Sequence, residues 1–477
     1  MLSLFRNSVF RPQLVSAQFF SSQLRKMKLE SAKFEVVLTP ELRTLSGMFS
    51  KHGHELRIAG GAVRDLLMDK TPTDIDFATT ATPEQMKEMF NSEEVRMINN
   101  QGEKHGTITA RIHDKENYEV TTLRIDKVTD GRRAEVEFTV DWEVDANRRD
   151  LTINSMFLGL DGTLYDYFNG NEDLKNRNVR FVGDPVQRIQ EDYLRILRYF
   201  RFYGRISEHA DNHEAVTVTA IRDNVAGMER ISGERIWMEW KKILKGNFSR
   251  ELTLKMVEVG LAPYIGLPEA PDTRQFDEVV SRAEQLGLQL EPAAQLAALL
   301  ATPEDAMRLH ARLKLSAVER DMCLFIVQHR GDPAPHPHPI RSISLYYTGN
   351  CPQAKSISRP YQYLAVDSKL KAADTRLYIE QVLAYRGQAE LLREFQLWTT
   401  PRFGVTGNHL KEAGCPPGKV MSVVLGRLKE EWKEKDFKIE VNDLVKRIPV
   451  VLDSIGPTEL QALSPPRSKK SKTKTNL

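Results

Sequence analysis

The chain has 477 residues, a formal net charge of +3 and 41% hydrophobic residues. This length exceeds what one hydrophobic core supports, so we expect roughly two to four domains of ordinary globular composition. The small net charge alone is no argument for a nucleic-acid partner. The three isolated cysteines, Cys323, Cys351 and Cys415, argue against a disulfide framework and a CxxC zinc site. No apolar run has the length of a membrane span.

The N-terminal stretch has a biased composition. It contains no acidic residue before Glu30, and its basic residues alternate with Leu, Phe and Ser. This composition predicts a mitochondrial transit peptide over residues 1–29, with an ordinary solvated terminus as the alternative. Met27 offers a second start, which would give an untargeted form in the cytoplasm or nucleus.

Residues 57–77, RIAGGAVRDLLMDKTPTDIDF, predict a strand, a Gly-Gly turn, a short helix and a second strand. On that second strand Asp74 and Asp76 share one face, where two carboxylates repel each other unless a cation such as Mg²⁺ lies between them. Gly60 and Gly61 let backbone N–H groups approach a phosphate closely. Taken singly, these features also fit a solvated strand edge and a plain turn. Their order and spacing favour nucleotidyl transfer with two metal ions.

The hydrophobic pattern changes along the chain. Residues 31–170 show strand alternation with few helices, and beyond Pro185 helical periodicity is almost continuous. We expect an α+β head with a mixed β-sheet, then an all-α neck, body and tail in an elongated chain. The expected strands are 56–59, 74–77, 95–98, 106–112, 118–125 and 135–139. The expected helices are 62–68, one from Thr82-Pro83, 151–159, 186–203, 213–228, 233–244, 250–259, 274–286, 293–301, 303–313, 317–330, 367–385, 389–399 and 418–435.

These patterns also predict domain boundaries. The expected domains are a transit peptide at 1–29, a catalytic head at 30–175, a neck at 176–265, a body at 266–400, a tail at 401–463 and a basic terminus at 464–477. The last segment is acid-free and of low complexity, so we expect it to be disordered.

Two stretches of the head supply further polar groups. Glu119, on the strand expected at 118–125, is the candidate third carboxylate beside the aspartate pair. The polar segment after it contains Asp130, Gly131 and Arg132. Asp-Gly is a turn signal, so this segment is predicted to be a mobile loop whose arginines can reach a triphosphate. A solvated hairpin loop is the alternative.

The run Asn147-Arg-Arg-Asp-Leu-Thr-Ile-Asn154 precedes an apolar stretch. The adjacent pair Arg148 and Arg149 suits bidentate phosphate contacts, and Asn154 can bond a ribose hydroxyl. In the plainer interpretation Asp150 caps the helix expected to follow.

The strongest helical signal runs from Glu191 to Phe202. Asp192 and Arg195, one turn apart, form a matched acceptor and donor that can imitate a Watson–Crick edge. The carboxylate accepts from the exocyclic amine of C or A, whereas U and G present mismatched groups. The alternative is an ion-paired helix surface with Glu191, Arg195 and Arg198 on one stripe.

Taken in order, these motifs resemble one family. Its signature is matched by Gly60-Gly61, Asp74-x-Asp76, Asp130-Gly131-Arg132, Arg148-Arg149-Asp150 with Asn154, Glu191-Asp192-x-x-Arg195-x-x-Arg198, and Ile231-Ser-Gly-Glu-Arg235. The chain is similar to the class II tRNA nucleotidyltransferases, or CCA-adding enzymes, of the polymerase β-like superfamily. The eukaryotic, mitochondrially targeted type is the most similar.

The resemblance implies roles at matching positions. Asp74 and Asp76 would ligate two Mg²⁺ ions, with Glu119 as the third carboxylate. The triphosphate and ribose site would contain Gly60, Gly61, Arg64, Arg148, Asp150 and Asn154. Base selection would fall to Asp192 and Arg195, with Arg198 beside them. The loop around Asp130 would accompany the switch from C to A.

The implied function is template-independent addition of CCA to the 3′ end of tRNA, with CTP and ATP as substrates and no membrane partner. Basic residues of the helical tail would grip the tRNA; the candidates are Lys411, Lys419, Arg427 and Lys429. Two alternatives stay open: a poly(A) polymerase with the same head and neck motifs, and a non-catalytic RNA-binding scaffold. The sequence does not decide between a monomer and a homodimer.

Overall fold

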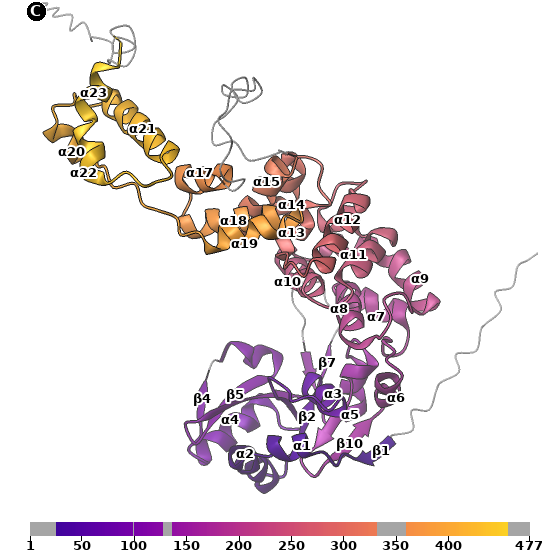
Figure 1. Ribbon diagram of the computed structural model, residues 1–477. Coiled ribbons are helices and arrows are strands. Elements are labelled where there is room, and N and C mark those ends of the chain that lie inside the picture. The colour runs from indigo at the N-terminus through magenta and orange to yellow at the C-terminus, as the bar shows by residue number, and fades with distance from the viewer. Residues whose placement is uncertain (1–24, 99, 127–135, 332–358, 457–477) are drawn as a thin grey trace, which may run out of the picture. The chain divides into compact units, whose positions relative to one another are not determined.

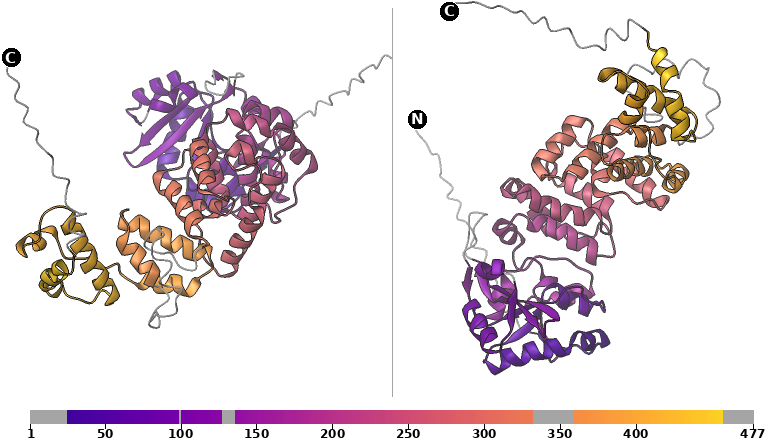
Figure 2. Two further views of the ribbon diagram at one scale, coloured as in Figure 1. Left: turned by 90° about the horizontal axis from the view of Figure 1, so that it is seen from above. Right: turned by 90° about the vertical axis from the view of Figure 1, so that its left-hand side faces the viewer.

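The computed structural model describes residues 25–98, 100–126, 136–331 and 359–456. By its internal contacts the chain divides into two compact units. One comprises Met1–Thr273 with Met307–Ser316, and the other Arg274–Ala306 with Ala317–Leu477. Throughout the described ranges, strands occur only in the first part of the chain, drawn in indigo and purple (Figure 1, Figure 2). This confirms the prediction of a mixed-sheet head followed by an all-α remainder.

The head is built on an eight-stranded sheet of order β1-β10-β9-β2-β3-β6-β5-β4. Neighbouring strands are antiparallel except β3 and β6, which are parallel. The strands are β1 Arg25–Lys28, β2 Leu56–Ala59, β3 Asp76–Thr79, β4 Arg96–Ile98, β5 Thr107–Ile112, β6 Glu116–Thr122, β9 Phe157–Gly159 and β10 Thr163–Asp166. A separate ribbon pairs β7 Arg124–Asp126 with β8 Val136–Phe138.

Strand β1 lies inside the segment 1–29 that the sequence assigns to a transit peptide. It pairs with β10, Arg25 opposite Asp166 and Lys28 opposite Thr163. The Lys28 ammonium also forms an ion pair with Asp161 at 2.7 Å. Residues 25–28 are therefore part of the sheet, and a boundary at residue 29 falls at the end of a strand.

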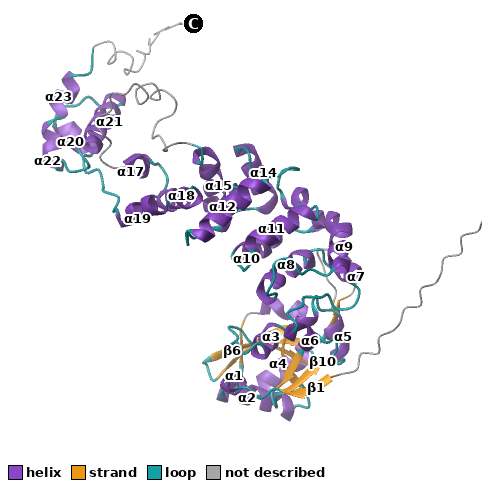
Figure 3. Ribbon diagram, turned by 45° about the vertical axis from the view of Figure 1, so that its right-hand side comes forward, coloured by secondary structure: helices purple, strands orange, loops and turns teal. Residues whose placement is uncertain are grey.

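Six short helices accompany the sheet: α1 Ala32–Val37, α2 Pro40–Lys51, α3 Gly61–Leu67, α4 Pro83–Ser92, α5 Trp142–Asn147 and α6 Gly170–Lys175 (Figure 3). Helix α4 begins as predicted, because Thr82 and Gln85 form a reciprocal capping box and Pro83 takes the first helical position. The sequence did not predict α5.

The helix expected over residues 151–159 is wrong. This apolar run forms one 3₁₀ turn, Thr152–Asn154, and then the strand β9. All three residues of β9 are buried, between β10 and β2. A central strand buried on both faces is apolar throughout, so periodicity alone cannot distinguish it from a buried helix.

The single helix expected over residues 186–203 is also wrong. It is divided into α7 Pro185–Glu191 and α8 Arg195–Ile206, with Asp192 in an extended conformation between them (φ −151°, ψ 105°). The Asp192 carboxylate accepts a hydrogen bond from the Leu194 backbone N–H at 3.1 Å. Aspartate favours such local bonds over a helix interior, which accounts for the break.

The neck continues with α9 Ala215–Asn224, α10 Gly233–Leu244 and α11 Ser249–Glu258. Helix α14, Pro303–Leu313, contributes its part from Met307 onward to the same unit. There the Arg312 guanidinium donates to the carbonyl oxygens of Met228, Ile231 and Tyr264, each at 3.0 Å. A Cβ at Gly233 would lie 1.8 Å from the Arg312 carbonyl oxygen, so only glycine permits this contact.

The second unit is helical throughout its described part. Its remaining helices are α12 Thr273–Gln285, α13 Pro292–Ala297, α15 Ala317–His329, α17 Arg359–Asp367, α18 Ala372–Tyr385, α19 Ala389–Leu397, α20 Gly407–Glu412, α21 Lys419–Glu434, α22 Val441–Lys446 and α23 Ile448–Asp453. The last four helices enclose a core that includes Val424, Leu428 and Trp432. Within the described ranges, no helix is both long enough and apolar enough to cross a bilayer.

Candidate active site

Carboxylates gather where β3 begins. Asp76 is the first residue of β3, and in the parallel pairing with β6 it lies opposite Glu119. Asp74 precedes the strand, so the expectation that both aspartates belong to it is wrong by two residues. Phe77, the next residue of β3, points to the opposite face of the sheet, where it is 1% exposed and packs edge-to-face on Tyr118. All three carboxylate residues are exposed to solvent.

These three carboxylates lack cationic partners. Within the described residues, none of them forms an ion pair with a lysine, arginine or histidine, and Asp74 accepts one long hydrogen bond, from Thr73 Oγ1 at 3.4 Å. Burial and the neighbouring Asp74 charge raise the pKa of Asp76, and the Arg149 charge partly opposes them. Oxygen donors that repel one another in this way suit a hard divalent cation.

The three carboxylates do not form a ready-made metal centre. No group of three His, Cys, Asp or Glu side chains in the described part of the chain is arranged to hold an ion. Mg²⁺ commonly binds through one or two carboxylates together with substrate phosphates, so an aspartate pair suffices when a triphosphate supplies the other ligands. The residues therefore fit a divalent ion bound together with its nucleotide.

The turn before α3 brings a guanidinium to this site. Gly60 has φ +63° and ψ −119°, a conformation that side-chain-bearing residues rarely adopt. A Cβ at Gly60 would lie 3.3 Å from Arg149 Nη1, and the same nitrogen donates to the Asn154 carbonyl oxygen at 3.3 Å. Arg149, one of the adjacent arginines that the sequence predicts to contact phosphate, therefore lies beside the glycine turn, and its charge acts on Asp76.

Arg64 and Asn154 are held by a buried chain of contacts. Arg64 is 3% exposed; it donates to Asn154 Oδ1 at 2.7 Å and to Asp65 Oδ1 at 2.9 Å. Burial lowers the pKa of Arg64. Asp65 also accepts from Arg205 of α8 at 2.8 Å. Arg64 thus orients Asn154 and is not free at the surface to meet a phosphate.

Asp150 links the same chain to the neck. Its Oδ2 accepts from Arg198 Nε at 2.6 Å, and its Oδ1 accepts from Leu151 N–H and, at 3.4 Å, from Asn154 Nδ2. Burial raises the pKa of Asp150, but the Arg198 charge and hydrogen bond outweigh that effect and leave the pKa below its ordinary value. Arg198 is therefore engaged with the head.

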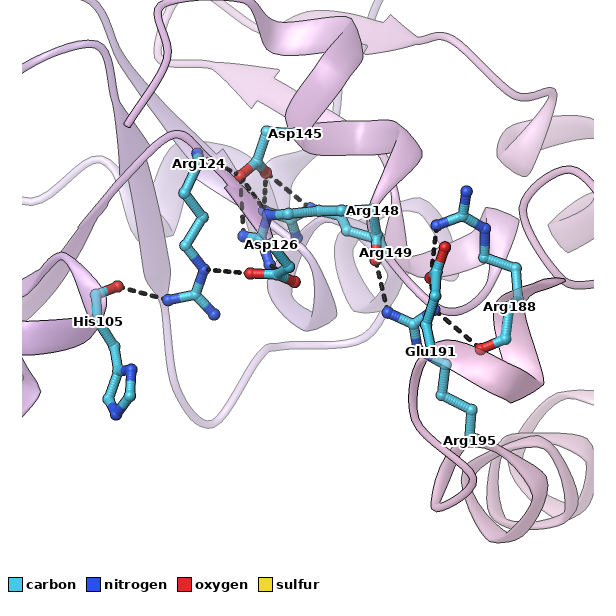
Figure 4. A network of polar contacts seen from close by, with 9 residues as sticks. All are labelled: His105, Arg124, Asp126, Asp145, Arg148, Arg149, Arg188, Glu191 and Arg195. Atoms are coloured by element: carbon cyan, nitrogen blue, oxygen red, sulfur yellow. Dashed lines mark hydrogen bonds and ion pairs between the residues drawn. The ribbon is translucent and has the colours of Figure 1, made fainter. Parts of the chain in front are cut away.

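The pair expected to select the base lies at the helix break: Asp192 is between α7 and α8, and Arg195 is the first residue of α8. Asp192 Oδ2 accepts from Arg235 at 2.8 Å. Arg195 donates to Glu191 Oε2 at 2.5 Å and, through Nη2, to the Arg148 carbonyl oxygen at 2.7 Å (Figure 4). The i,i+4 ion pair between Glu191 and Arg195 is present, as the ion-paired interpretation expected. Arg235 is a contact that helical spacing did not reveal.

The remaining predicted residues belong to the loop around Asp130 and to the second unit. Asp130, Gly131 and Arg132 are outside the described residues. In the second unit Lys411 is exposed on α20 and Lys419 is exposed at the start of α21, whereas Lys429 forms an ion pair with Asp367 at 2.8 Å. Arg427 donates to Ser454 Oγ at 2.9 Å.

Comparisons with known proteins agree with the fold and with the family that the motifs resemble. A family model of the poly A polymerase head domain matches residues 56–180, and one of the probable RNA and SrmB-binding site of polymerase A matches 214–272. Mitochondrial CCA tRNA nucleotidyltransferase 1 of Homo sapiens is 50% identical over 422 residues, covering 88% of this chain and 93% of that protein. The protein of the same name from Danio rerio is 49% identical over 425 residues, covering 89% and 94%.

A solved structure extends the likeness to the whole fold. The Bacillus stearothermophilus CCA-adding enzyme in complex with CTP matches with a TM-score of 0.65 at 25% identity, covering 88% of this chain and 99% of that one. The mixed-sheet head with its unpaired carboxylates thus defines a nucleotidyltransferase, a class that uses divalent metal ions. More closely, the chain belongs to the CCA tRNA nucleotidyltransferase family.

Replacing Asp76 with Asn is expected to stabilise the metal-free protein at neutral pH. Because the pKa of Asp76 is raised above 3.8, the folded chain binds this proton more tightly than the unfolded chain, so stability falls as pH rises through that range. Asp76→Asn does not lose stability in this way, so it should be more stable than the wild type at neutral pH. The difference in stability should vanish at pH values below the pKa of Asp76 in the unfolded chain. Urea denaturation in EDTA at several pH values measures the difference.

Glu116→Gln is the matched control, since Glu116 is an exposed carboxylate on β6 outside the site. It should leave the urea midpoint nearly unchanged. A midpoint for Asp76→Asn at or below that of the wild type at pH 7 would contradict the raised pKa.

Proposed function

We propose that this protein adds the sequence CCA to the 3′ end of tRNA, using CTP and ATP, without a nucleic-acid template and with release of pyrophosphate. The observation that carries the proposal is the group of carboxylates near the start of β3, Asp74, Asp76 and Glu119, which form no ion pair within the described residues. Arg149 acts on Asp76 through its charge, and the helix break at Asp192 belongs to the same unit. The names of the 50% and 49% identical relatives support this substrate.

Asp74 and Asp76 would hold Mg²⁺, which supplies activation of the attacking 3′-hydroxyl and neutralisation of the departing phosphates when bound. Around it, Arg148 and Arg149 offer guanidinium groups that match phosphate oxygens. Asn154, whose Oδ1 accepts a hydrogen bond from Arg64, would bond the ribose hydroxyl. Holding the reacting groups in place supplies much of the catalysis in phosphoryl transfer.

Base choice would rest on Asp192 and Arg195. Arg235 forms an ion pair with Asp192, and Glu191 forms one with Arg195. A bound C or A would exchange these contacts for hydrogen bonds to its Watson–Crick edge. U or G would leave a buried donor or acceptor unpaired, which is costly.

A poly(A) polymerase is the second candidate, because the head model that matches residues 56–180 is described by that name. We further propose a mitochondrial location, supported by the names of the relatives and by the basic, acid-free N-terminus. The proposal does not extend to the cytoplasm or nucleus. A chain starting at Met27 would begin in the middle of β1 and lose the pairings of Arg25 and Lys26.

A tRNA transcript that lacks its last three nucleotides provides the direct assay. With Mg²⁺ we expect two additions from CTP alone and a third only when ATP is also present. Asp74→Ala should abolish both steps and leave tRNA binding nearly intact. A long tract from ATP alone would show a poly(A) polymerase instead, and no extension by the wild type would indicate an RNA-binding scaffold.

Asp192→Ala is expected to relax nucleotide choice more than it slows the reaction. A matched donor–acceptor pair contributes about 1–3 kcal/mol of discrimination, so the preference for C and A over U and G should fall by roughly tenfold to a hundredfold. Competition assays with mixed triphosphates measure this ratio. Asp184→Ala, which removes only the cap of α7, is the control. Unchanged preference in Asp192→Ala would refute the selecting role.

A further inference from the structure

One buried carboxylate holds three separate parts of the site. Asp145, on α5, is 1% exposed, and both its oxygens accept hydrogen bonds (Figure 4). Its Oδ1 accepts from Arg148 Nε at 2.8 Å and from the Arg124 backbone N–H at 3.1 Å. Its Oδ2 accepts from Arg149 Nε at 3.1 Å and Nη2 at 3.0 Å. No motif of the sequence drew attention to it.

The groups bound to Asp145 lead to different parts of the site. Arg149 reaches the Gly60 turn and the Asn154 carbonyl oxygen, and its charge acts on Asp76. Arg148 reaches Asp126 of β7 at 3.4 Å. The backbone carbonyl of Arg148 accepts from Arg195, the arginine beside the neck break. Asp145 thus contacts both Arg148 and Arg149, and it is connected to Arg195 through the backbone of Arg148.

The charge balance makes this contact difficult to replace. Two guanidinium groups on consecutive residues repel each other, and each is only 18% exposed, so water screens them poorly. Burial raises the pKa of Asp145, but Arg149 and Arg148 outweigh it and keep the pKa below the ordinary value. The carboxylate is therefore ionised at neutral pH. Removing its charge leaves Arg149 without its acidic partner and Arg148 with only the longer contact to Asp126, and removing one member of a partly buried ion pair is costly.

We propose that Asp145 is the positioning residue of the nucleotide site: it fixes the directions of Arg148 and Arg149 and, through the Arg148 backbone, the position of Arg195. It touches no substrate itself. The proposal rests on the proposed function, because it assigns these arginines to the nucleotide. It predicts that nucleotide binding and base choice change together when Asp145 is altered, although the residue lies on neither surface.

The test compares Asp145→Asn with Asp141→Asn in the full chain. Asp141 caps the same helix, accepting from Glu143 N–H at 2.9 Å, and its side chain has no recorded bond to either arginine. With Asp145→Asn we expect KM for CTP and ATP to rise by roughly tenfold or more and discrimination against UTP and GTP to fall, with a smaller effect on kcat. Asp141→Asn should keep all three values within about twofold and leave the thermal midpoint nearly unchanged, because asparagine caps a helix about as well as aspartate does.

Equilibrium binding of CTP, measured by calorimetry, separates this proposal from the catalytic one. If the wild type binds CTP and Asp145→Asn binds it weakly, the positioning proposal is supported even if the protein adds no nucleotide to tRNA. If Asp145→Asn does not fold, Asp145→Glu takes its place: it keeps the charge and should show a smaller rise in KM. Unchanged KM and base choice in a destabilised Asp145 variant, or equal changes in Asp141→Asn, would overturn the proposal.

Discussion

Repulsion among uncompensated carboxylates is the constraint on which the rest of the site depends. Asp74, Asp76 and Glu119 have no cationic partner within the described residues, and the pKa of Asp76 is raised by burial and by Asp74. The arginines around them are neutralised instead by other, buried aspartates: Asp65, Asp145 and Asp150. This separation leaves negative charge where the proposed metal ion would bind and orders the arginines that would meet the phosphates. The carboxylate cluster depends on the parallel pairing of β3 with β6, which places Asp76 opposite Glu119, 43 positions later in the chain.

The same network joins the head to the first neck helices. Helix α8 contacts the head through three arginines: Arg195 to the Arg148 carbonyl, Arg198 to Asp150 and Arg205 to Asp65. These contacts recur at intervals of three and seven residues, so they lie along one side of the helix. Two of these contacts end on aspartates that also bond to other residues of the site: Asp150 bonds to Asn154, and Asp65 bonds to Arg64. The arginines of α8 and the residue assigned to the ribose therefore share one set of polar contacts.

Local sequence patterns predicted a large part of this structure. The Gly-Gly turn, the capped start of α4 and the helix Gly233–Leu244 follow from short-range chemistry. The patterns failed at two places for different reasons. Phe157–Gly159 is a strand because it lies between two others, which is a tertiary effect, whereas the helix breaks at Asp192 because of a local bond from Leu194 to its carboxylate. Asp145 was not predicted, although its ion pairs with Arg148 and Arg149 have the i,i+3 and i,i+4 spacing of helix neighbours. That spacing is common on solvated helix surfaces, and it does not show that Asp145 is buried.

Binding of Mn²⁺ in the presence of CTP, followed by electron paramagnetic resonance of the free ion, tests the central claim most directly. Wild-type protein should bind the ion, and Asp76→Asn should lose affinity by roughly tenfold or more because a carboxylate ligand is removed. Asp145→Asn should keep its affinity for Mn²⁺ once the CTP concentration is raised to saturate that variant, since Asp145 orders arginines and not the metal. Equal Mn²⁺ binding by the wild type and Asp76→Asn would contradict the assignment of the carboxylates at the start of β3.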